Sequence, residues 1–143
     1  MILTCLGGMS TAMACVVLNM NSFLFSFPIE PVPASRPRVT RWGAYYGKRY
    51  TSFRKQADSV IPLVFTGQPL AGTLEVLVTF YCKRPKTTKR EEPRGDVDNY
   101  VKAILDSCNG KVFEDDDQIK RITATKRWED EHGPRIELYV SKA

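Results

Sequence analysis

Residues 94–119 read RGDVDNYVKAILDSCNGKVFEDDDQI, with an acidic segment on each side of an apolar stretch. The apolar residues recur every three or four positions, which predicts a helix from about residue 98 to residue 107. Asn109-Gly110 is a typical helix end. The residues after the second acidic segment alternate between apolar and polar, which predicts a strand over 119–128. Carboxylates concentrated in this way inside a basic protein indicate a place where a divalent cation meets phosphate.

The rest of the chain is basic, and its charge is unevenly distributed. The 143 residues carry a formal net charge of +5, and their number suits one domain with a core of its own. Residues 35–56 contain seven Lys and Arg and no acid, and residues 83–94 contain six Lys and Arg against two Glu. Such clusters of positive charge favour a phosphate backbone as partner.

The remaining sequence alternates between strand and helix patterns. Apolar alternation predicts strands over 23–29, 74–81, 119–128 and 134–140, and the last two are expected to pair as an antiparallel hairpin. Helical spacing predicts a helix that starts with Thr51 or Ser52 as its N-cap and runs to about Phe65. Pro62 is expected to kink this helix or to mark its end. A proline-rich segment precedes a short aromatic turn or hairpin at residues 42–47.

The first twenty residues differ from the others because they are small, apolar and uncharged. They lack the basic start of a signal peptide, and the apolar run is too short and interrupted for a membrane span. We expect Met20 to be the natural start, because a strand pattern begins at Asn21. The alternative is a genuine but loosely ordered extension. The chain is therefore divided into an atypical segment, 1–20, and one domain, 21–143.

Cysteine and histidine do not indicate a metal site. The four cysteines form no C-x-x-C pair, and the sole histidine, His132, lies in a turn far from them in sequence. A zinc site is therefore not expected. Four cysteines without a disulfide framework suit a reducing cytoplasm.

The carboxylates at the start of the helix over 98–107 allow two interpretations. At a junction between loop and helix, Asp96 and Asp98 can turn toward one point, where free N–H groups favour negative charge. In the simpler interpretation, Asp98 is only an N-cap. Lys102 follows one turn later on the same face. It is either the partner of Asp98 in a surface ion pair worth roughly 0.3–0.5 kcal/mol, or a lysine beside a metal that stabilises charge on a phosphate or helps to activate water.

The acidic run over 114–117 also has two interpretations. It is either a solvated turn before a strand or a group of carboxylates whose mutual repulsion is relieved by a bound cation.

The pattern Asp96-x-Asp98-Asn99-x-x-Lys102, followed by Asp-Asp-x-Gln-Ile at 115–119, resembles the RusA family of Holliday junction resolvases. The proline-rich segment over 31–38 and the basic loop before Asp96 are similar to that family as well. The resemblance covers about residues 23–140. Each motif is weak alone, but their order and spacing make the combination specific.

The resemblance implies an α+β fold with two layers, in which helices pack on one face of a mixed β-sheet. It implies a homodimeric, Mg²⁺-dependent endodeoxyribonuclease of phage or prophage origin, with Mn²⁺ as a substitute, that cuts four-way DNA junctions in recombination and repair. A two-fold dimer suits a four-way junction because both have the same symmetry. The expected location is the cytoplasm of a bacterial host.

The resemblance also assigns roles to residues. It implies that Asp96, Asp98 and Asp116 hold the metal and that Lys102 is catalytic. Asn99 and Gln118 are expected to orient the ligands. Asp115 and Asp117 are rivals of Asp116, although the register set by Gln118 favours Asp116.

Branched DNA is the expected partner, with no membrane and no nucleotide cofactor. The residues expected to contact its backbone are Arg36, Arg38, Lys86, Lys89, Arg90 and Arg94. Two alternatives stay open: a nuclease for other branched DNA such as flaps or forks, and a catalytically silent DNA-binding module in which the carboxylates merely cap and solvate.

Overall fold

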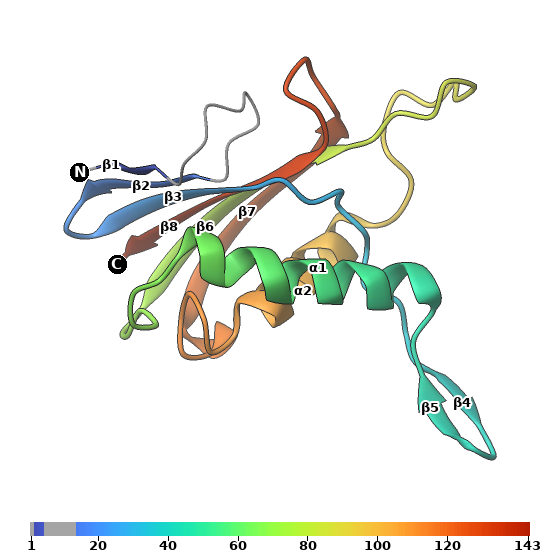
Figure 1. Cartoon of the computed structure of the whole chain (residues 1–143), viewed down its shortest axis with the longest axis horizontal. Helices are drawn as coiled ribbons and strands as arrows, with labels where there is room; N and C mark the ends of the chain where they lie inside the picture. Colours follow the sequence, from blue (N-terminus) through green and yellow to red (C-terminus); the bar gives the residue numbers. More distant parts are fainter. Residues whose placement is uncertain (1, 5–13) are drawn as a thin grey trace.

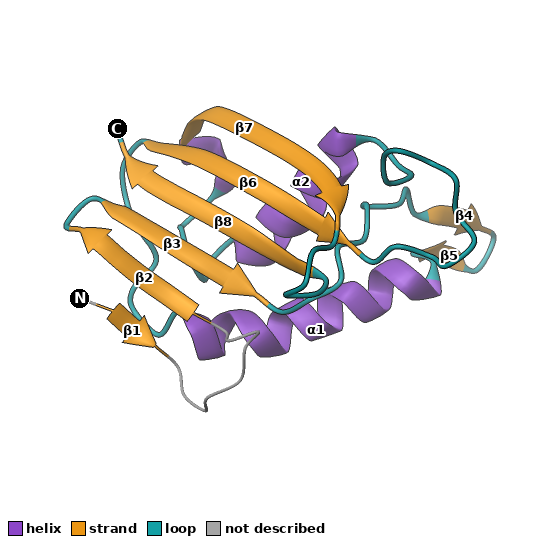
Figure 2. Cartoon of the chain, turned by 90° about the horizontal axis from the view of Figure 1, so that it is seen from above, coloured by secondary structure: helices purple, strands orange, loops and turns teal. Residues whose placement is uncertain are grey.

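A mixed β-sheet with the strand order β1-β2-β3-β8-β6-β7 forms one layer of the computed structural model, which describes residues 2–4 and 14–143 (Figures 1 and 2). Its strands are β1 (Ile2–Thr4), β2 (Ala14–Asn19), β3 (Ser22–Phe27), β6 (Leu74–Cys82), β7 (Ile119–Trp128) and β8 (Arg135–Lys142). Helices α1 (Lys48–Val64) and α2 (Val97–Cys108) lie side by side on one face. A separate hairpin joins β4 (Arg38–Thr40) to β5 (Gly43–Tyr45), and a short 3₁₀ helix, η1, spans Asp116–Gln118. The predicted α+β class with a mixed sheet is confirmed.

The core lies between the sheet and the two helices. In β6, buried and more exposed residues alternate, so Val76, Val78 and Phe80 point to the same face. The buried residues of α1 recur at helical spacing. Each large apolar side chain fully buried in this way contributes about 1.5–3 kcal/mol to folding. This packing holds α2, and with it the acidic motif, against the sheet.

The predicted hairpin of the last two strands is wrong. Strand β8 pairs antiparallel with both β3 and β6, whereas β7 pairs parallel with β6 at the edge of the sheet. Ile136, Leu138 and Val140 of β8 are all fully buried, and a central position gives them neighbours on both sides. The unit β6-α2-β7 is therefore a crossover between parallel strands.

Helix α1 begins earlier than its sequence pattern predicts, whereas α2 agrees with the helix predicted over about 98–107. Helix α1 starts at Lys48 with Gly47 as its N-cap, and the hydroxyl of Thr51 donates a hydrogen bond to the Gly47 carbonyl from inside the first turn. Thr51 and Ser52 thus lie inside the helix, and neither is the predicted cap. Pro62 lies in the last turn, so the helix ends soon after it.

Part of the atypical N-terminal segment joins the sheet. Strand β2 pairs antiparallel with β3, and Cys15 of β2 is fully buried. The expected boundary at residue 20 falls in the turn between these strands. Residue 1 and residues 5–13 lie outside the described residues, and the natural start at Met20 stays a prediction.

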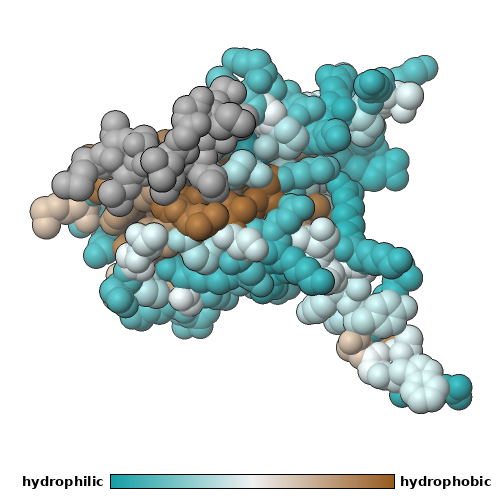
Figure 3. Space-filling view, viewed as in Figure 1, coloured by the Kyte–Doolittle hydropathy of each residue, from teal (hydrophilic) through white to brown (hydrophobic). Residues whose placement is uncertain are grey.

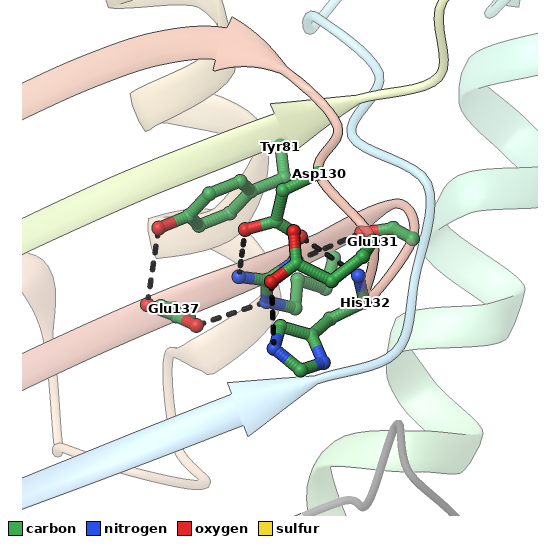
Figure 4. Close-up of polar contacts among 7 residues, drawn as sticks. Tyr81, Asp130, Glu131, His132 and Glu137 are labelled. Carbon is green, nitrogen blue, oxygen red and sulfur yellow. Dashed lines mark hydrogen bonds and ion pairs between the residues drawn. The ribbon is translucent and has the colours of Figure 1, made fainter.

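A cluster around Arg135 fixes the turn between β7 and β8 (Figure 4). The buried guanidinium makes two hydrogen bonds to the Asp130 carboxylate, of 2.6 and 3.0 Å, and one of 2.9 Å to Glu137. It also lies 3.7 Å from the ring centre of Tyr81. Such bidentate pairs are geometrically specific, so they hold the turn in one conformation.

Candidate functional site

The basic loop between β6 and α2 is held in place by β7. The ammonium of Lys126 donates hydrogen bonds to the carbonyls of Pro93 and Gly95, at 2.8 and 2.6 Å. The indole of Trp128 donates one to the carbonyl of Arg90 at 3.1 Å. Gly95 has φ near +98°, and a Cβ there would lie 3.2 Å from Pro33. These contacts fix the direction in which the chain enters α2.

Asp96, not Asp98, is the N-cap of α2. Its carbonyl accepts hydrogen bonds from the N–H groups of Asn99 and Tyr100, but its side chain caps no N–H. Asp98 lies in the first turn, and both carboxylates are exposed. Neither carboxylate has a hydrogen bond or an ion pair with any residue that the structure describes. Two uncommitted carboxylates therefore stand at the positive end of a helix.

Lys102 pairs with a residue that the sequence patterns did not single out. Its ammonium lies 3.2 Å from a carboxylate oxygen of Asp106, one turn later in α2, and not on Asp98. The hydrogen bond with Asp106 raises the pKa of Lys102, and the charge of Asp116 adds to this effect. Spacing could have found Asp106, because residues 98, 102 and 106 follow one face of the helix.

Asp116, at the end of the α2-β7 connection, interacts electrostatically with the Lys102–Asp106 pair. It is half-buried, and burial is the main reason that its pKa is raised. The neighbouring carboxylate of Asp115 raises it further, as does Asp106, whereas Lys102 lowers it. The fold thus brings Asp116 into the electrostatic reach of Lys102 and Asp106.

Gln118 holds the acidic turn to the rest of the domain. Its amide N–H₂ group donates to the carbonyls of Leu70 and Gly72, at 3.0 and 2.8 Å. Its amide oxygen accepts a 2.8 Å hydrogen bond from the N–H of Asp115, and the Asp115 carboxylate in turn caps the N–H of Gln118. This reciprocal capping box commits Asp115 to the turn. Asp117 is exposed, and Asp116 is the member of the run whose charge acts on Lys102.

A hollow of about 280 Å³ lies beside Lys102. It is lined by Ala34, Ser35, Arg36, Pro37, Tyr46, Tyr50, Asn99, Lys102 and Asp106. The backbone N–H of Ala34 donates to the carbonyl of Asn99 at 2.9 Å, which ties the proline-rich segment to the start of α2. The structure thus brings the predicted Arg36, Asn99 and Lys102 together, while Arg38 lies on the exposed strand β4.

A second hollow, of about 350 Å³, gathers positive charge and meets α2 at Tyr100. Its lining includes Arg49, Lys83, Arg90 and Arg94, together with the ring of Trp128. The sequence patterns single out Arg90 and Arg94 but not the other two cations. Lys86 and Lys89 are exposed on the same loop.

The carboxylates of the two acidic segments are ligands that a hard divalent cation prefers. In the described part of the chain, however, they are not gathered into one complete binding site. Across residues 2–4 and 14–143, no group of three or more His, Cys, Asp or Glu side chains is close enough to hold a metal ion. Mg²⁺ typically takes one or two carboxylates and completes its shell with water and substrate phosphates. The two free carboxylates, Asp96 and Asp98, match that demand.

Two comparisons with known proteins bear on the family to which the chain belongs. The family model described as endodeoxyribonuclease RusA matches residues 28–141. A Bacillus subtilis (strain 168) protein described as uncharacterized protein YqaN is 25% identical over 139 residues, which cover 85% of this chain and 96% of that protein. Neither helix in the described part of the chain is long and apolar enough to cross a membrane.

Proposed function

The chain belongs to the RusA family of endodeoxyribonucleases, and from this premise we propose that it resolves four-way DNA junctions by Mg²⁺-dependent hydrolysis of phosphodiesters. The observation that carries the proposal is the grouping of Lys102 with Asp106 and Asp116 beside a hollow that Arg36 lines. Negative charge grows on a phosphate during hydrolysis. A lysine can stabilise that charge directly, and carboxylates beside the lysine can hold a metal ion that does the same.

Asp96, Asp98 and Asp116 are the proposed metal ligands, with Mg²⁺ as the ion and Mn²⁺ as a substitute. When bound, the ion supplies activation of water and neutralisation of charge on the phosphate. Lys102 stabilises the negative charge that grows on the phosphate, and Asp106 positions Lys102 for that task. Asn99, half-buried in the wall of the hollow, orients these groups, and Gln118 fixes the turn that carries Asp116.

The cations around the site hold the DNA by its backbone. Arg36 lines one hollow and Arg90 and Arg94 line the other, and the two hollows meet α2 at the neighbouring residues Asn99 and Tyr100. Lys86 and Lys89, exposed on the same loop, and Arg38 extend this surface. These contacts position a duplex without reading its sequence.

The active species is proposed to be a homodimer, because a two-fold dimer places two equivalent sites on opposing strands of a junction. The protein acts in recombination and repair in the cytoplasm of a bacterial host that carries the phage or prophage gene. The free, buried thiols of Cys82 and Cys108 support a reducing compartment.

The decisive experiment compares Asp98→Asn with the parent on a labelled four-way junction, a flap and a linear duplex, with and without Mg²⁺. We expect Asp98→Asn to keep junction binding and to lose Mg²⁺-dependent cleavage, because it removes an exposed ligand that supports no contact in the described fold. Glu131→Gln changes the charge equally in the β7-β8 turn and should cleave like the parent. Unchanged cleavage by Asp98→Asn would refute the metal assignment.

One alternative is a DNA-binding module without catalytic activity. It is favoured by the absence of a group of three or more possible metal ligands among the described residues. In that case the parent binds the junction but does not cut it with Mg²⁺ or Mn²⁺. Preferential cutting of the flap would instead identify a nuclease for other branched DNA.

A further inference from the structure

The hairpin of β4 and β5 projects from the body of the protein at the end where the proline-rich segment meets α1 (Figure 1). Every residue of both strands is exposed. We call residues 38–45 the hairpin arm. Its exposed surface includes large apolar side chains: Val39 is 81% exposed, Trp42 85% and Tyr45 51%. Such side chains are costly to leave in water, so their gathering on one projection indicates a binding surface.

The tip of the arm has a defined geometry. Thr40 pairs with Gly43, which leaves Arg41 and Trp42 as a two-residue turn. The Thr40 hydroxyl donates to the Gly43 carbonyl and accepts from the N–H of Trp42, both at 3.2 Å. Gly43 has φ near +121°, which other residues rarely adopt. The turn therefore presents Arg41 and Trp42 together, with the guanidinium 4.9 Å from the centre of the indole ring.

The arm is anchored at the rim of the candidate site. Tyr46, the residue after the arm, packs edge-on against Tyr50 of α1, with ring centres 5.4 Å apart. Tyr46 and Tyr50 also line the hollow that contains Lys102. A molecule bound beside Lys102 would therefore extend toward the arm.

The hairpin arm is positively charged, and this charge indicates what kind of molecule it binds. No acidic residue occurs between Ser35 and Gln56, and the arm itself carries Arg38 and Arg41. In the space-filling view the arm projects at the lower right as a mostly pale extension that ends in a hydrophilic residue (Figure 3). Two copies of such an arm would repel each other. Arginine next to an exposed indole suits nucleic acid, which offers phosphates and base faces.

We propose that the hairpin arm enters the centre of branched DNA, where Trp42 stacks on a base at the branch point while Arg38 and Arg41 contact the adjacent phosphates. The inference rests on the proposed function. In continuous duplex every base is already stacked on its neighbours, and a wedge must first unstack a step. At a branch that stacking is interrupted, so insertion costs less. The arm thus favours branched over linear DNA.

The test measures binding of the full-length protein without divalent cations, at one fixed salt concentration. The ligands are a four-way junction and a linear duplex of the same strand length, and the variants are Trp42→Ala and Trp42→Phe. Loss of one stacked base is expected to lower junction affinity roughly 5- to 150-fold in Trp42→Ala. Trp42→Phe, which keeps an aromatic face, should retain most of the affinity. Binding to the duplex should be almost unchanged in both.

Met20→Ala is the matched control. Met20 is 90% exposed in the turn between β2 and β3, at the opposite end of the protein from the arm (Figures 1 and 2). Its loss removes an exposed apolar side chain without touching the arm, so junction binding should not change. Tryptophan fluorescence gives a second readout: the difference between the parent and Trp42→Phe isolates Trp42, and its emission should change with junction but not with duplex.

Three outcomes would overturn the inference, and they are distinguishable. If the parent prefers junction to duplex and Trp42→Ala does so equally, the arm does not read the branch, while the proposed function stands. If the parent itself shows no preference for the junction, the proposed function fails and takes this inference with it. If Trp42→Ala instead lowers the molecular mass in solution, the arm binds a second copy of the chain and not DNA.

Discussion

Lys102 illustrates how a single side chain acquires its role from a partner. A lysine is already protonated at neutral pH, and the hydrogen bond with Asp106 raises the pKa of Lys102 further. A protonated lysine is a positive charge and a proton donor, not a base. Of its two expected roles, stabilising a phosphate suits this state better than activating water.

Asp106→Asn tests this role. Asparagine keeps the size of the side chain but loses the charge that holds the ammonium of Lys102 at 3.2 Å. Because small displacements of a catalytic group are costly, we expect kcat for junction cleavage to fall roughly 10- to 100-fold, with KM and junction affinity almost unchanged. Single-turnover cleavage measures the rate, and gel shift without metal measures binding.

Asp106→Glu and Asp58→Asn provide the controls for this prediction. Glutamate restores the charge and should recover part of the rate. Asp58 forms a comparable ion pair with Lys111, in which the lysine belongs to the α2-β7 connection. Asp58→Asn should cleave like the parent. An equal loss of rate in Asp58→Asn would point to a general effect on stability and not to positioning of Lys102.

At the scale of elements, the acidic turn depends on the connection between α1 and β6. Gln118 reaches that connection at Leu70 and Gly72, and the Leu70 backbone pairs in turn with Val112 and Glu114. A turn of carboxylates would otherwise open through its own repulsion. These hydrogen bonds hold η1 at the start of β7, where Asp116 meets α2.

Gln118→Ala should therefore damage both stability and activity. The change removes three hydrogen bonds, and we expect the free energy of unfolding to fall by about 1–3 kcal/mol. Urea unfolding measures this loss. We also expect the half-saturating Mg²⁺ concentration for cleavage to rise, because Asp116 is no longer held. Gln56→Ala, an exposed change on α1, should alter neither quantity.

At the scale of the whole molecule, the crossover β6-α2-β7 organises the charge. It places free carboxylates at the start of α2 and Asp116 after its end, while the basic loop lies against β7. The two hollows meet α2 at neighbouring residues, Asn99 and Tyr100. Acidic and basic side chains are therefore gathered in separate places within one domain, so the site can bind a metal cation and a polyanion such as DNA together.

The stability of the whole domain should depend on pH through the cluster at the β7-β8 turn. Hydrogen bonds from Arg135 hold the pKa of Asp130 well below its usual range. In the unfolded chain an aspartate titrates near pH ~3.9. The stabilisation is thus fully present above about pH 4 and is lost as the pH falls through the lower folded-state pKa.

Asp130→Asn tests this dependence. We expect the variant to melt below the parent at pH 7, because Arg135 is left without its bidentate partner, and the difference should shrink as the pH falls toward 2. Thermal unfolding across that range measures it. Glu131→Gln, at the exposed neighbouring residue, should follow the parent. A constant difference between Asp130→Asn and the parent at every pH would contradict the linkage.

Local patterns in the sequence determined much of this protein. The periodicity of residues 74–81 and about 98–107 is enough to identify β6 and α2, and the aromatic segment at 42–47 includes the second strand of the β4-β5 hairpin. The order and spacing of the two acidic motifs, with the proline-rich segment before them, sufficed to identify the family, which the match over 28–141 confirms. These features depend on residues a few positions apart, whose geometry the backbone fixes.

Only the tertiary structure decided the contacts between distant segments. Strand β8 enters between β3 and β6 because its buried residues need neighbours on both sides, which no local pattern reveals. Asp116 lies fourteen positions after Lys102, and Arg36 lies sixty-six before it, yet packing of the crossover and the proline-rich segment brings both to the lysine. The choice of Asp106 over Asp98 as partner of Lys102 is likewise a matter of side-chain geometry, since both lie four residues away on the same face.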